Sequence, residues 1–230
     1  LDNPGVVKNR SGLPIPVPGV VGPIHRHAVG VDELNFLRAH TTRQVKITVP
    51  GPVTMICLAQ YDFHSSDETM AMAYAAVLNG EIRDLFAAGA DIVPIDEPCT
   101  RAQLEKTRQY ALRALNTALD GIADTTAVHS GFAHPAMVVQ RPGGCGFLHE
   151  LRGCRCRQVS IETAQSRLDC SVLAQLPERQ IMVGCIDLSD VAVETPEANA
   201  DRIRRALPHG AKERIILATD CGRKFQPREV

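Results

Sequence analysis

Ionisable side chains recur at one kind of place in this sequence. Each stands at or just past the carboxyl end of a short apolar run: Asp96-Glu97, His129, Glu162, Asp187 and Asp220-Cys221. In a parallel α/β barrel all such strand ends meet at one face, where the active site is built. Any one of these residues could be a solvated loop residue or a helix cap. Together they predict a chemical site at one mouth of the fold.

Three residues of this set could bind a metal ion. His129, Glu162 and Cys221 offer nitrogen, oxygen and sulfur, all of which zinc accepts, and catalytic zinc keeps three protein ligands and one open position. Their spacing is too long for a local metal motif, so a metal-free acid/base site of histidine and carboxylates is an open alternative. For most of the eight cysteines we expect buried thiols, since the chain is too large for a disulfide scaffold.

The elements that must position these residues are strands alternating with helices. Short apolar runs predict strands near residues 45–49, 92–95, 126–129, 158–161, 181–185 and 215–218. Most of the runs lack polar alternation, which is typical of strands buried on both faces of a parallel sheet. A doubly wound open sheet has the same pattern, but no Gly-rich phosphate loop follows any run. We therefore predict an α/β fold of the TIM-type (β/α)8 barrel class.

Segments between the predicted strands have the residue pattern of helices. Helices are predicted at about residues 67–88, 104–119, 168–176 and 195–207. Ser65 with Glu68 forms a capping box before the first of them, and Gly89 supplies its end. Residues 1–30 are rich in proline and glycine, and predict an extended entry segment.

Length and charge limit the class of protein. We expect residues 1–230 to form a single catalytic barrel domain. The 25 Lys and Arg nearly balance 26 Asp and Glu, which argues against a nucleic-acid partner. No apolar run approaches the ~20 residues that span a bilayer, and no leader opens the chain at Leu1. We expect an internal piece of a cytoplasmic protein without a membrane partner, and its oligomeric state is left open.

Four segments together resemble the catalytic barrel of the cobalamin-independent methionine synthase family. They are VKITVPGPVTM, AAVLNGEIRDLFAAGADIVPIDEP, QVSIETAQSRLDCSVLAQLP and ATDCGRKFQPREV. The resemblance spans residues 20–230 and is closest to short relatives without the duplicated N-terminal barrel. It implies a zinc-dependent methyltransferase, in which a homocysteine thiolate takes the methyl group of a 5-methyltetrahydrofolate (polyglutamate) and becomes methionine.

The resemblance also implies residue roles. His129, Glu162 and Cys221 match the family's zinc ligands. Asp96 matches the catalytic-site aspartate that holds the amino group of the substrate. The adjacent Glu97 is a second candidate for substrate binding, although capping the following helix is its simpler role.

One departure from the family concerns the first ligand motif. The family has His-x-Cys, whereas this chain has His129-Ser130-Gly131. We therefore expect weaker zinc binding and a gap beside the metal at Gly131. Four residues in or beyond the following loop are candidate replacements: Cys145, Cys154, Cys156 and His134.

Two further departures bear on catalysis and on the extent of the barrel. Ser189 stands where full-length synthases have a proton-relay histidine, which the short relatives often lack. The family's first barrel strand does not appear, so we expect a barrel that is incomplete at its N-terminus and lacks its first strand or strands.

Three alternatives to a methionine-forming enzyme stay open. The chain could be a related zinc-thiol alkyltransferase that acts on another thiol. It could be a non-catalytic barrel that has lost the metal, as the glycine at position 131 suggests. A zinc-free barrel of the uroporphyrinogen decarboxylase type would need converging arginines, and no such cluster stands at the strand ends.

Overall fold

A six-stranded parallel sheet forms the centre of the protein. The computed structural model describes residues 5–8, 14–102, 104–131, 146–188 and 192–222. The strand order in this sheet is β10-β9-β8-β7-β6-β4, and every neighbouring pair is parallel. The strands are β4 (Val49–Pro50), β6 (Val93–Asp96), β7 (Thr126–His129), β8 (Gln158–Glu162), β9 (Gln180–Ile186) and β10 (Ile215–Thr219).

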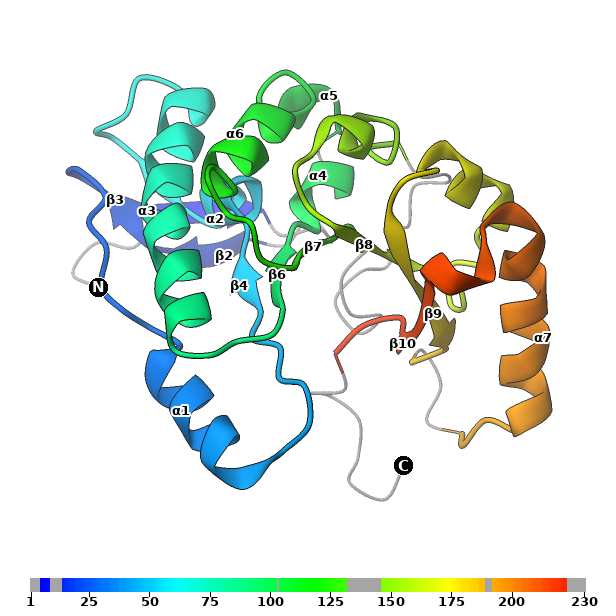
Figure 1. Ribbon diagram of the computed structural model, residues 1–230. Coiled ribbons are helices and arrows are strands. Elements are labelled where there is room, and N and C mark those ends of the chain that lie inside the picture. The colour runs from blue at the N-terminus through cyan, green and yellow to red at the C-terminus, as the bar shows by residue number, and fades with distance from the viewer. Residues whose placement is uncertain (1–4, 9–13, 103, 132–145, 189–191, 223–230) are drawn as a thin grey trace.

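The spatial order of these strands follows their order in the chain. A doubly wound sheet reverses its strand order at a switch point, and no reversal occurs in the part of the chain that the structure describes. Figure 1 shows α3, α6 and α7 following one another around the outside of the curved sheet. This arrangement confirms a parallel α/β fold and is that of a barrel wall. Within the described residues, β4 and β10 each pair on one side only.

The remaining elements are helices and short strand pairs. The α-helices are α1 (Val31–His40), α2 (Pro52–Cys57), α3 (Asp67–Ala87), α4 (Cys99–Ala102), α5 (Leu104–Thr107), α6 (Ala111–Ala118) and α7 (Pro196–Ala206). The 3-10 helices are η2 (Glu150–Gly153), η3 (Cys170–Gln175), η4 (Leu207–His209) and η5 (Lys212–Arg214). The short strands are β1 (Gly5–Lys8), antiparallel to β2 (Pro14–Val17), and β3 (Gly19–Val20), parallel to β5 (Gln60–Tyr61). Among the described residues, no helix has the length and apolar character needed to cross a membrane.

The predicted strands are confirmed, with one reduced in length. The run at 45–49 pairs with its neighbour only through a bridge at Lys46 and through Val49–Pro50. Pairing is interrupted between these two points, where the register places Pro94 of β6, and proline has no N–H to donate to a ladder. The other five strands lie within two residues of their predicted bounds.

Helix α3 begins one residue later than its predicted capping box. Ser66, not Ser65, is the N-cap: its backbone is extended, and its Oγ accepts a hydrogen bond of 3.1 Å from the Thr69 amide. The predicted end is confirmed, because Gly89 has φ 96°, a conformation that favours glycine.

Two other predicted helices differ from the structure. The span 104–119 divides into α5 and α6, with the non-helical backbone of Tyr110 preceding α6. Arg108 in this turn forms an ion pair of 2.5 Å with Glu150, a tertiary contact that local periodicity does not contain. The span 168–176 is the 3-10 helix η3, capped by the Asp169 side chain.

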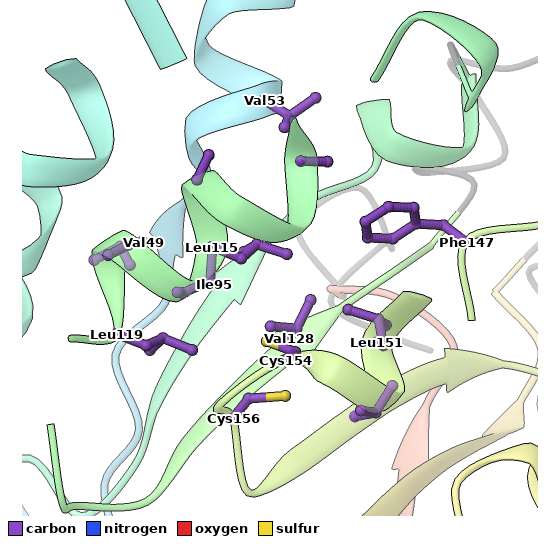
Figure 2. Packing of buried hydrophobic residues seen from close by; sticks show 14 of the residues in the cluster. Val49, Val53, Ile95, Leu115, Leu119, Val128, Phe147, Leu151, Cys154 and Cys156 are labelled. Atoms are coloured by element: carbon purple, nitrogen blue, oxygen red, sulfur yellow. The ribbon is translucent and has the colours of Figure 1, made fainter. Parts of the chain in front are cut away.

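The cysteines near η2 belong to the hydrophobic core. Cys154 and Cys156 are 1% and 0% exposed, and Figure 2 shows them packed among Val128, Leu151 and Phe147. Both precede the first residue of β8, so they lie at the amino end of the sheet, on the order of 20 Å along the strand from its carboxyl end. The expectation that either could replace a missing zinc ligand is therefore wrong.

Candidate metal and substrate site at the strand ends

The carboxyl ends of strands β6 to β10 carry the residues singled out in the sequence. One such residue ends or directly follows each strand: Asp96, His129, Glu162, Asp187 and Asp220. In the sheet register Asp96 lies beside His129. Because all five strands are parallel and lie side by side, these ends share one edge of the sheet.

The imidazole of His129 is oriented by the neighbouring strand. A hydrogen bond of 2.9 Å joins its Nδ1 to Oγ of Ser160, which is its register partner in β8. When Nδ1 donates its proton to this hydroxyl, Nε2 carries the lone pair. Metal-binding histidines are commonly fixed in this way through their second nitrogen. Ser160 was not among the predicted site residues, because its role depends on strand register.

Nε2 of His129 faces the carboxylate of Glu162. The distance from Nε2 to Oε1 is 3.8 Å, and the Glu162 side chain is fully buried. The other oxygen, Oε2, accepts a hydrogen bond of 3.0 Å from the Gln165 side chain. Two ligands bound at about 2.0–2.2 Å to one tetrahedral ion lie roughly 3.3–3.6 Å apart. The two atoms would therefore need to move by only a few tenths of an ångström to share a zinc ion.

Gly131 lies directly against this pair. A Cβ added to Gly131 would lie 2.4 Å from Oε1 of Glu162 and 2.5 Å from Nε2 of His129. The gap expected at Gly131 is thus filled by the ends of these two side chains. The position at which the family has a cysteine is nevertheless adjacent to both candidate ligands.

Cys221 is part of the same electrostatic environment. Burial raises the pKa of its thiol, and the negative charges of Glu162 and Asp96 raise that pKa further. The thiol therefore stays protonated at neutral pH unless a cation compensates these charges. Within the ranges that the structure describes, no three His, Cys, Asp or Glu side chains are arranged closely enough to hold a metal ion. The convergence of Cys221 with His129 and Glu162 stays a prediction.

The two acidic residues at the end of β6 have different surroundings. Asp96 is partly exposed, and its carbonyl oxygen accepts a hydrogen bond of 2.9 Å from the Gly51 amide. Its role in holding a substrate amino group stays a prediction. Glu97 is 0% exposed, and its carboxylate accepts hydrogen bonds of 2.9 Å from the amides of Val53 and Thr54.

Glu97 thus caps a helix that precedes it in the chain. Its Oε2 also accepts a hydrogen bond of 2.8 Å from the Thr54 hydroxyl, so the carboxylate satisfies the amino end of α2. A Cβ on Gly51 would lie 2.2 Å from the carboxyl carbon of Glu97, which requires glycine there. Burial raises the pKa of Glu97 to about 8, against the opposing effect of these hydrogen bonds. Substrate binding by Glu97 stays a prediction.

Asp220 has a structural role that the sequence did not indicate. Its buried carboxylate accepts hydrogen bonds from three consecutive backbone amides, those of Thr163, Ala164 and Gln165. Burial raises the pKa of Asp220 to about 6, and these hydrogen bonds oppose the shift. Cys145, His134 and Ser189 lie outside the described residues.

Comparison with known proteins identifies the family. The model of the family described as "Cobalamin-independent synthase, Catalytic domain" matches residues 5–230. The chain belongs to this family. A B12-independent methionine synthase from Shewanella sp. W3-18-1, solved in complex with selenomethionine, superposes with a TM-score of 0.92 at 28% identity. The match covers 99% of this chain and 70% of that one, and confirms the TIM-type α/β barrel fold of this synthase-family domain.

Curated methionine synthases are more distant in sequence and longer. The protein from Sulfurisphaera tokodaii is 27% identical over 201 residues, which is 87% of this chain and 56% of that protein. The protein from Thermococcus kodakarensis is 26% identical over 208 residues, which is 90% of this chain and 59% of that protein. The chain therefore spans less than two thirds of the length of these relatives.

Proposed function

We propose that this member of the cobalamin-independent synthase family is a zinc-dependent methyltransferase. It would transfer the methyl group of a 5-methyltetrahydrofolate (polyglutamate) to the thiolate of homocysteine, giving methionine. The observation that carries the proposal is the pairing of His129 Nε2 with Glu162 Oε1 at 3.8 Å. Family membership supports it, as does the solved relative, which was bound to selenomethionine, a methionine with selenium in place of sulfur.

Each residue has a definite task in this proposal. His129 and Glu162 would hold zinc through Nε2 and Oε1, and Cys221 would be the third ligand. When bound, zinc lowers the pKa of the substrate thiol, so that the sulfur is present as the nucleophilic thiolate at neutral pH. Asp96, at the end of the strand beside His129, would accept charge-assisted hydrogen bonds from the ammonium group of homocysteine.

A non-catalytic barrel without metal is the second candidate. It is favoured by Gly131, which provides no ligand, and by the side chains of His129 and Glu162, which fill the space beside it. The two candidates differ in whether the purified chain binds zinc.

The test combines metal content with product formation. Elemental analysis of the full chain after zinc loading should find about one zinc ion per chain, and Cys221→Ser should reduce it. Mass spectrometry should detect methionine formed from homocysteine and a methyltetrahydrofolate polyglutamate. Zinc without methionine would point to another thiol substrate. Absence of zinc in the wild-type chain would favour the non-catalytic barrel.

A further inference from the structure

Asp220 reaches from the end of β10 to the turn that leaves β8. The residue is 1% exposed. Its Oδ1 accepts hydrogen bonds from the amides of Thr163 (3.0 Å) and Ala164 (3.1 Å), and its Oδ2 accepts one of 2.6 Å from the Gln165 amide. These three consecutive amides directly follow Glu162. One carboxylate therefore fixes the backbone that carries a candidate zinc ligand.

The carboxylate makes this contact by passing over β9 at a glycine. A Cβ on Gly184 would lie 2.1 Å from Oδ1 of Asp220 and 2.8 Å from its Cα. A side chain at position 184 would therefore push Asp220 away from the β8 turn. The Thr163 hydroxyl donates a hydrogen bond of 2.8 Å to the Gly184 carbonyl, and the Asp220 amide donates one of 3.1 Å to the Ile186 carbonyl. The three strand ends are thereby tied together.

The same network continues to the carboxylate of Glu162. Gln165 donates its backbone amide to Asp220 and, through Nε2, a hydrogen bond of 3.0 Å to Oε2 of Glu162. The Ser166 hydroxyl adds a hydrogen bond of 2.8 Å to the Glu162 carbonyl. The backbone position of Gln165, set by Asp220, thus determines how its side chain holds Glu162.

On its other side, Asp220 is bonded directly to Cys221. Strands β8 and β10 are separated by β9, so their ends lie about 10 Å apart, twice the usual strand spacing. Glu162 and Cys221 can meet at one ion only if these ends are held at a fixed separation and rotation. Asp220 is bonded to one of these residues and hydrogen-bonded to the turn of the other.

We propose that Asp220 is a positioning residue, which sets the placement of Glu162 and Cys221 for metal binding. The inference rests on the proposed zinc-dependent function and deepens it. The role assigned to Asp220 is indirect, because its carboxylate accepts hydrogen bonds from three amides of the β8 turn. A merely structural cap would contribute to folding stability and leave the metal ligands of the folded protein unaffected.

The test uses Co²⁺ as a spectroscopic probe of the candidate site. A thiolate bound to Co²⁺ gives a sulfur-to-metal charge-transfer band, and loss of this band in Cys221→Ser assigns it to Cys221. In Asp220→Asn one carboxylate oxygen is replaced by the side-chain NH₂ group. This NH₂ group cannot accept a hydrogen bond and would face a backbone N–H of the β8 turn. We expect Co²⁺ and Zn²⁺ to bind this variant roughly 10–100-fold more weakly, as for other residues that orient metal ligands. We also expect the charge-transfer band to be weakened or lost at saturating metal.

Two further variants complete the experiment. Asp169→Asn makes the same change at an exposed carboxylate that caps η3, away from the strand ends, and should keep both affinity and band. Gln165→Met removes the side-chain hydrogen bond to Glu162 and keeps the backbone amide that Asp220 accepts, and it should weaken metal binding without loss of folding. If Asp220→Asn does not fold, the metal affinity of Gln165→Met tests the positioning network instead.

The outcomes separate this inference from the proposed function. Wild-type protein that binds metal with a thiolate band, together with folded Asp220→Asn that binds equally well, overturns the positioning role alone. If Asp220→Asn is unfolded, a Gln165→Met variant that binds metal as tightly as the wild-type chain also overturns the positioning role alone. A wild-type chain that binds neither ion overturns the proposed function and the positioning role with it.

Discussion

Nε2 of His129 lies 3.8 Å from Oε1 of Glu162, and the Cα of Gly131 is so close that a Cβ there would lie within 2.5 Å of both atoms. The two interfering atoms are the far ends of side chains, which can rotate more easily than backbone can shift. Residue 131 is therefore placed to contribute a further ligand beside His129 and Glu162, although glycine has none.

Replacing Gly131 with cysteine should raise zinc occupancy. A thiolate is a strong zinc ligand and neutralises part of the ionic charge, so Gly131→Cys should bind zinc more tightly than the wild-type chain. Elemental analysis after dialysis against a weak chelator measures the change. Gly131→Ala is the control, because it introduces the same Cβ without a ligand and should show no gain. Equal zinc content in the cysteine and alanine variants would contradict the placement of the metal site.

Removing the Ser160 hydroxyl should weaken zinc binding while the fold is retained. Ser160→Ala deletes the 2.9 Å hydrogen bond to His129 Nδ1, so the imidazole loses its fixed tautomer and orientation. We expect roughly 10–100-fold lower zinc affinity by competition with a chromogenic chelator. Ser65→Ala, at an exposed serine before α3, should have wild-type affinity. An unchanged affinity in Ser160→Ala would show that the serine does not support a metal ligand.

Asp96→Ala should weaken homocysteine binding more than folding. Loss of a charge-assisted hydrogen bond to the substrate ammonium group should cost about 1.5–3 kcal/mol of binding free energy. Isothermal titration calorimetry on the zinc-loaded protein gives the affinity, and urea unfolding gives the stability. Asp124→Ala, at an exposed residue before the opposite end of β7, is the control. Wild-type homocysteine affinity in Asp96→Ala would remove the role assigned to Asp96.

Glu97 should make the stability of the protein depend on pH. Its folded-state pKa of about 8 exceeds the ordinary value of 4.5, so between these values the folded protein holds a proton that the unfolded chain releases. This contribution to stability is complete below about pH 4.5 and is lost as the pH rises through about 8. Urea unfolding of metal-free protein from pH 5 to 9 should therefore show a decline that Glu97→Gln lessens.

Glu105→Gln controls for a change of carboxyl to amide at an exposed site, since the Glu105 side chain is 90% exposed. Its unfolding free energy should follow the wild-type profile across the same pH range. A Glu97→Gln profile parallel to the wild-type one would show that Glu97 is ionised throughout, as its three hydrogen-bond donors favour.

Local patterns were sufficient to predict the strands and the residues at their ends. The strands that end at Asp96, His129 and Glu162 are mostly apolar or buried along their length, and burial on both faces leaves few alternatives to a parallel sheet. Parallel strands bring their carboxyl ends to one edge whatever their exact register. The common location of these residues therefore followed from the sequence, and the family resemblance added their roles as ligands.

The contacts that orient those residues required the tertiary structure. Ser160 meets His129 because of the register between β7 and β8, and Glu97 caps a helix that begins 45 residues earlier in the chain at Pro52. Asp220 reaches the β8 turn only because Gly184 leaves room above β9. Such hydrogen bonds join residues distant in sequence, and they depend on register and close approach at the scale of an ångström. Hydrophobic periodicity encodes which residues are buried, and the packed sheet decides which of them meet.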